Sequence, residues 1–174
     1  MTKNRSIILN ILRFFLPSVL TLLWLCFIYG NSLQTGVESG EASGQVHHIM
    51  NMPFEFFGLG TPLSEYFIRK AAHFTEFFIL GALVCADLWC FSVLTLRRRL
   101  EYSILVISSA LPVCTALAAC DEYLQGFVDG RGSSVKDVLI DTSGAFTAIL
   151  IFGVLFYIVR IIYSYSKAKV KAGN

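Results

Sequence analysis

The sequence predicts an all-α integral membrane protein, a bundle of four transmembrane helices with both termini in the cytoplasm. Hydrophobic residues make up 55% of the 174 residues and charged residues only 15%, whereas soluble domains average roughly 25% charged residues. The apolar residues are gathered into long runs that alternate with short basic clusters. A net charge of +2 is too small to indicate nucleic-acid binding. The length suits one domain, residues 1–174.

Four segments are apolar enough to cross a bilayer, which takes about 20 residues of helix. They are 7–29, 74–96, 102–119 and 138–159. The third has 18 residues and would reach ~27 Å at 1.5 Å per residue, which is marginal but sufficient. The first is too long for the apolar part of a signal peptide, so we expect it to remain as an uncleaved span.

The basic residues around these spans predict the orientation of the bundle. Cytoplasmic segments of membrane proteins carry an excess of Lys and Arg. With four crossings, three separate clusters fall on one side of the membrane. The clusters are Lys3, Arg5 and Arg13; Arg97, Arg98 and Arg99; and Arg160, Lys167, Lys169 and Lys171. We therefore expect the connections 30–69 and 121–137 to lie outside.

The first outer connection is expected to contain a short amphipathic helix. Val46, Ile49 and Met50 have helical spacing, and an apolar segment follows at 54–59. Such a segment can lie in the outer membrane interface. His47 and His48 are interpreted as solvated loop residues. Thr61-Pro62 is expected to begin the second spanning helix, because Pro is tolerated in a first helical turn.

Ionisable residues enter the predicted spans at their outer ends. Arg69, His73 and Glu76 share one helix face through their 4-3 spacing. Charged groups in lipid are costly and are usually functional. The candidates for catalysis are His73, Glu76, Asp121, Glu122 and Asp141, and the candidates for ligand contact are Ser32, Gln34, Arg69, Lys70, Gln125, Arg131, Ser134 and Asp137.

A purely structural interpretation also exists for these polar residues. The charges nearly balance, so the network would staple the helices together. Small residues such as Gly144 and Ala148 already offer a cheaper means of helix packing. Asp87 lies in the inner half of the second span and is expected to form a structural ion pair with Arg13 or with an arginine of 97–99.

Three motifs resemble the VanZ-like membrane proteins. They are Asn31-Ser32-x-Gln34-x-Gly36-x-x-Ser39-x-x-x-Ser43; Arg69-Lys70-x-x-His73-Phe74-x-Glu76-Phe77; and Asp121-Glu122-x-x-Gln125-x-Phe127-x-x-Gly130-Arg131-x-x-Ser134-x-x-Asp137-x-x-x-Asp141-x-x-Gly144. They cover roughly residues 25 to 150. Asp129 stands where a proline is commoner. The resemblance implies a bacterial cytoplasmic-membrane protein and, through the namesake of the family, a link to teicoplanin resistance. It implies no settled reaction.

Three functions remain open from the sequence. The first is a protein of the envelope whose outer site binds or modifies a lipid-linked cell-wall precursor or a glycopeptide antibiotic, with arginines on phosphate or carboxylate. The second is a membrane hydrolase or transferase in which His73 acts as a base beside Glu76 or Asp141. The third is a small transporter.

The sequence assigns neither a metal site nor a cofactor. Zinc-ligand spacing, a nucleophile elbow and a phosphate-binding loop are all missing from it. If the protein is an enzyme, a divalent metal would have oxygen ligands available, which suit magnesium or calcium. Those oxygens would come from Glu76, Asp121, Glu122, Asp137 or Asp141.

Overall fold

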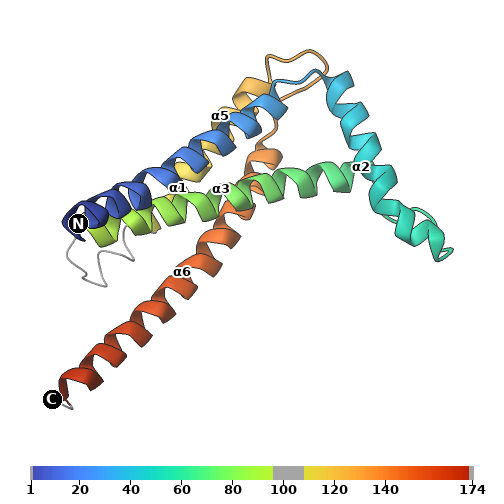
Figure 1. Ribbon diagram of the computed structural model, residues 1–174. Coiled ribbons are helices and arrows are strands. Elements are labelled where there is room, and N and C mark those ends of the chain that lie inside the picture. Colours follow the sequence, from blue (N-terminus) through green and yellow to red (C-terminus); the bar gives the residue numbers. More distant parts are fainter. Residues whose placement is uncertain (1, 96–107, 173–174) are drawn as a thin grey trace.

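The computed structural model describes residues 2–95 and 108–172, and all regular structure in these two ranges is helical. The helices are α1 (Thr2–Ser32), α2 (Gly36–Phe56), α3 (Glu65–Thr95), α5 (Ala110–Gln125) and α6 (Val135–Ala172). In Figure 1, α5 lies along α1, α3 is close to α1 near the N-terminus and diverges from it toward α2, and α6 crosses α3 and diverges toward the C-terminus. Helix α2 leaves the opposite end of the bundle. The prediction of an all-α fold is confirmed.

Within the described residues, three helices are long and apolar enough to cross a membrane. The qualifying stretches are Phe15–Ser32 in α1, Glu65–Cys90 in α3 and Val135–Tyr163 in α6. They overlap the predicted spans 7–29, 74–96 and 138–159. The predicted span 102–119 begins outside the described residues, and its described part belongs to the 16-residue helix α5. The fourth crossing and the orientation therefore remain predictions.

The apolar side chains of these helices mostly face outward. Leu22 and Leu23 of α1 are each 62% exposed, as is Ile162 of α6. The core between the helices is small and includes Phe77 and Leu80 of α3. A chain that exposes so much apolar surface on long helices requires lipid around it. The fold is that of a multi-pass membrane protein.

Close contact between α3 and α6 depends on small residues. A Cβ atom on Gly81 would lie 2.8 Å from the carbonyl oxygen of Ala145, and one on Gly144 would lie 3.0 Å from the carbonyl carbon of Phe74. Because these neighbours are backbone atoms, no larger side chain fits at either glycine. Gly144 and Ala148 were predicted to pack helices together. In the structure, Gly144 lies against the backbone of α3 and Ala148 is fully buried.

The connection between α1 and α3 differs from its predicted form. Instead of a short helix, α2 has 21 residues and begins at a capping box between Thr35 and Glu38. Its buried Asn51 accepts a hydrogen bond from the Leu63 amide and donates to the Leu63 carbonyl. Helix α3 begins at Glu65, where the Ser64 hydroxyl accepts from the Phe67 amide.

The expectation that Thr61-Pro62 begins the second spanning helix is therefore wrong. The capping residue is Ser64, whose hydroxyl satisfies an amide that the first helical turn leaves without an intrahelical partner. Pairing of Leu63 with Asn51 holds the preceding residues against α2. The predicted position of α2 in the membrane interface remains a prediction.

Asp87 of α3 accepts hydrogen bonds from two hydroxyl groups of α1. Ser18 donates at 2.8 Å and Thr21 donates at 2.6 Å, one to each carboxylate oxygen. The ion-pair partners expected for Asp87 cannot be compared with the structure, because residues 97–99 and the side chain of Arg13 are not described. The two hydroxyls show that Asp87 joins α3 to α1.

Candidate functional site

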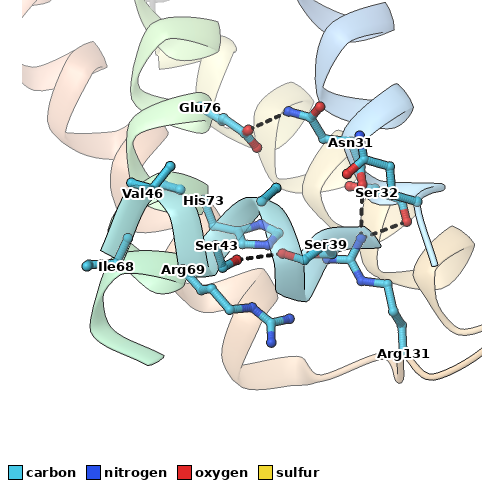
Figure 2. Close-up of a pocket in the computed structure, with 13 residues that line it drawn as sticks. Asn31, Ser32, Ser39, Ser43, Val46, Ile68, Arg69, His73, Glu76 and Arg131 are labelled. Carbon is cyan, nitrogen blue, oxygen red and sulfur yellow. Dashed lines mark hydrogen bonds between the residues drawn. The ribbon is translucent and has the colours of Figure 1, made fainter. Parts of the chain in front are cut away.

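A pocket of about 260 Å³ lies where α1 ends and α2 and α3 begin. Figure 2 shows Arg69 of α3 and Arg131 of the segment after α5 among the side chains that line it, with the Arg131 guanidinium against the end of α1. Neutral polar side chains make up much of the remaining wall. The lining residues are Asn31, Ser32, Gln34, Ser39, Ala42, Ser43, Val46, Ile68, Arg69, Ala72, His73, Glu76 and Arg131.

A tight turn places Arg131 at the mouth of this pocket. Gly130 has a φ of +74°, a left-handed conformation that favours glycine. The amide of Gly36 donates to the carbonyl of Asp129 at 3.0 Å, and a Cβ on Gly36 would lie 2.5 Å from the Gly130 oxygen. Only a glycine at position 36 allows the turn to approach the start of α2 this closely.

Arg131 also caps the end of α1. Its Nη1 donates to the carbonyl oxygens of Asn31 and Ser32, both at 3.0 Å. Carbonyls at a helix C-terminus lack intrahelical partners and favour a cation. Burial and, less strongly, the nearby charge of Arg69 lower the pKa of the Arg131 guanidinium. Arginine has five N–H donors, so the cap leaves most of them available to a ligand.

Arg69 is exposed and less constrained. In the part of the chain that the structure describes, its guanidinium has no hydrogen bond and no ion pair. The neighbouring Lys70, by contrast, forms an ion pair with Asp137 at 2.6 Å. Two guanidinium groups therefore share one pocket without a carboxylate bound to either, an arrangement that suits an anion.

A buried polar network connects α1 to α5 behind the pocket. The Ser32 hydroxyl donates to Asp121 at 2.9 Å, and the Gln125 amide donates to Asp121 at 3.0 Å and to Ser32 at 3.2 Å. Asn31 donates to the Glu76 carboxylate at 2.9 Å. The last two residues of α1 therefore contact α3, α5 and the segment that follows α5.

A cluster of acids and one histidine adjoins this network. His73, Asp121, Glu122 and Asp141 each offer one potential ligand atom, and these atoms all lie within 4.8 Å of one another. His73 Nδ1 lies 3.5 Å from Asp141 Oδ1. Because His73 also lines the pocket, its imidazole lies at the boundary between the two polar regions.

The candidate residues identified from the sequence divide into three groups. The first group lines the pocket and consists of Ser32, Gln34, Arg69, His73, Glu76 and Arg131. The second group forms the buried network and the acid cluster and consists of Ser32, which belongs to both groups, with Asp121, Glu122, Gln125 and Asp141. The third group is the ion pair between Lys70 and Asp137. Ser134 contributes through its backbone amide, which donates to Glu122 at 2.8 Å.

Three polar residues of the pocket were not among the sequence candidates, although all three belong to the first motif. They are Asn31, Ser39 and Ser43. Ser39 and Ser43 are four residues apart and share a face of α2, but the sequence pattern indicated a helix only further along. Treating the segment after Thr35 as a capped helix would have identified them.

Long apolar helices and a charged site at one end define the class, a multi-pass helical membrane protein with a polar pocket. The family model described as VanZ/LLP1 matches residues 17–157. The chain therefore belongs to the VanZ/LLP1 family. No curated protein and no solved structure matches it significantly.

Proposed function

We propose that the protein binds the anionic head group of a lipid-linked envelope molecule, with the tail of that molecule remaining in the bilayer. The observation that carries this proposal is the pair of guanidinium groups, Arg69 and Arg131, in one pocket. Arginine forks match the oxygens of phosphate and carboxylate. Gln34, Ser39 and Ser43 would supply neutral hydrogen bonds.

The size of the pocket favours a head group over a whole antibiotic. Sites that enclose a drug-sized ligand measure roughly 300–1,000 Å³, and this pocket measures about 260 Å³. A phosphate or a peptide carboxylate fits such a volume. The lipid tail would lie along exposed apolar side chains such as Val37 and Phe67, which are 73% and 57% exposed.

Native mass spectrometry of the protein, gently extracted from its own membrane, tests the proposal. The wild type should retain an anionic lipid or prenyl-linked species, and Arg69→Gln should lose it. Arg69 is the residue to change because Arg131 also caps α1. Lys136→Gln removes an equal charge from an exposed residue outside the pocket and serves as the control. Equal lipid retention in Arg69→Gln and the wild type would exclude this site.

We place this site on the non-cytoplasmic side of the bacterial cytoplasmic membrane, in keeping with the positive-inside rule. A protein that sequesters or modifies cell-wall precursors there would change sensitivity to teicoplanin. Cells producing Arg69→Gln should then differ in teicoplanin sensitivity from cells producing the wild type at equal abundance. Identical sensitivity in those strains and in a deletion strain would separate the protein from glycopeptide resistance.

An enzyme acting on a lipid-linked phosphate is the second candidate, and the position of His73 favours it. Its imidazole lines the pocket while its Nδ1 lies 3.5 Å from Asp141. A histidine oriented by a carboxylate is a common general base. Release of phosphate from an extracted lipid-linked substrate should be lost in His73→Gln with the fold retained. Binding without turnover in the wild type would favour the binding function.

A further inference from the structure

Four side chains from three helices meet beside the pocket. His73 of α3, Asp121 and Glu122 of α5, and Asp141 of α6 bring one potential ligand atom each to within 4.8 Å of the others. The three acids are at most 2% exposed. Three carboxylates so close together repel one another strongly when they are ionised and shielded from water.

Each carboxylate on α5 is held by one oxygen and leaves the other unpaired. Asp121 Oδ2 accepts from Ser32 and Gln125, and Glu122 Oε2 accepts from the Ser134 amide. Within the described residues, Asp121 Oδ1 and Glu122 Oε1 have no hydrogen-bond partner. Hydrogen bonds of this kind orient carboxylates that bind metal ions.

Asp141 has even less to offset the repulsion between the three carboxylates. Both of its oxygens are buried without a hydrogen-bond partner among the described residues, as is His73 Nδ1 at 3.5 Å from it. A buried acid with neither oxygen bonded is rare in a folded protein. Apart from their 3.5 Å contact with each other, both groups are therefore available to a further partner.

Within the described residues, the nearby Lys and Arg side chains form no ion pair with the three acids. Lys70 pairs with Asp137, and Arg131 donates to the backbone carbonyls that end α1. Among the described residues, His73 is the basic group that forms an ion-pair contact with a member of the cluster. One imidazolium cannot balance three carboxylates, whereas a divalent cation would balance two of them directly.

We propose that His73, Asp121, Glu122 and Asp141 form a binding site for a divalent transition-metal ion, with Mn²⁺ as the best match. Carboxylates suit Mn²⁺, and an imidazole favours a transition metal over Mg²⁺ or Ca²⁺. Ligands on opposite sides of a coordination sphere of ~2.2 Å radius lie ~4.4 Å apart. Neighbouring ligands of the same sphere lie ~3.1 Å apart, so binding would draw together four atoms that now lie within 4.8 Å of one another.

The pocket gives this site a route of access, because His73 lines both. An ion held there would lie close enough to the pocket to bind an anionic head group as well. The metal site does not depend on the lipid-binding function, because its potential ligand atoms come from His73 and the three acids and not from Arg69 or Arg131. The two proposals can therefore be refuted separately. Measurements of lipid retention test the lipid-binding function, and measurements of ion binding test the metal site.

Titration of the chelator-treated protein with Mn²⁺, followed by electron paramagnetic resonance, tests the site. The wild type should bind a single Mn²⁺, and the affinity should fall about tenfold or more in Asp141→Asn and Glu122→Gln. Asp129→Asn removes an exposed carboxylate outside the cluster and outside the pocket, and should bind as the wild type does. Affinity should also fall with decreasing pH, because protons compete for the ligands.

A second measurement uses the wild type and does not depend on the stability of acid variants. Bound Mn²⁺ should show electron spin echo modulation from an imidazole nitrogen, and His73→Gln should lose this modulation. Absence of Mn²⁺ and Zn²⁺ binding by the wild type would overturn the proposal, and so would undiminished binding by folded Asp141→Asn. Bound Mn²⁺ without nitrogen modulation would also overturn it, because the ion would then lie elsewhere.

Discussion

A single methyl group at Gly144 should destabilise the protein and open the acid cluster without changing any polar residue. The Cβ of an alanine there would lie 3.0 Å from the Phe74 carbonyl carbon, closer still to its oxygen, and 3.2 Å from the Phe78 amide nitrogen. Ordinary contact begins at 3.4 Å, so α3 and α6 must separate by more than the difference of 3.4 − 3.0 = 0.4 Å. Overpacking of this kind costs roughly 1–3 kcal/mol.

The same movement reaches the polar residues directly. His73 precedes Phe74, and Asp141 lies three residues before Gly144 on α6. The 3.5 Å separation of His73 Nδ1 and Asp141 Oδ1 should therefore lengthen together with the helix separation. Weaker Mn²⁺ binding should accompany the loss of stability, although every proposed metal ligand is still present.

Unfolding in mixed micelles with increasing sodium dodecyl sulfate measures this cost. Gly144→Ala should unfold earlier than the wild type, by roughly 1–3 kcal/mol in free energy of unfolding. Gly40→Ala is the matched control, because a Cβ there meets nothing within 4 Å and alanine favours a helix over glycine by up to about 1 kcal/mol. If Gly144→Ala behaves like Gly40→Ala, the two backbones are not in contact and the reasoning is refuted.

Two further substitutions test how the other helices are attached. Asn51→Ala should cost about 2 kcal/mol by leaving both backbone groups of Leu63 without their partner, and amide hydrogen exchange should rise across 57–64; unchanged exchange would contradict it. Asp87→Asn should lower the free energy of unfolding by about 1 kcal/mol, because Ser18 and Thr21 lose a charged acceptor. The lipid bound per folded molecule should stay the same, and its loss at normal abundance would give Asp87 a functional role.

The sequence predicted best where a single helix carries the information. Spacing alone placed Arg69, His73 and Glu76 on one face of α3, and all three line the pocket. Hydropathy located the three long apolar helices for the same reason, since a span must satisfy its own backbone in lipid. In both cases the prediction needed information from one segment of the chain alone.

Features that depend on contacts between segments were not predictable. The capping of α1 by Arg131 requires the left-handed Gly130 and the contact of its turn with Gly36. No helical period links residues 31 and 131. Likewise, Lys70 was named as a candidate for ligand contact, but the crossing of α3 and α6 brings it to Asp137. A change of one residue along a helix turns a side chain by about 100°.

The end of α1 separates the two charged regions of the site. Ser32 uses its hydroxyl on Asp121 and its carbonyl on Arg131, while Asn31 uses its amide on Glu76 and its carbonyl on Arg131. The cationic pocket and the acidic cluster therefore share one wall and could not be moved apart without breaking α1 from both. His73 belongs to both regions, so a head-group anion in the pocket and a cation on the acids would meet at its imidazole. An arrangement that only stapled helices would pair the arginines with the acids. Their separation across a neutral helix end is what favours a site for ligands of both signs.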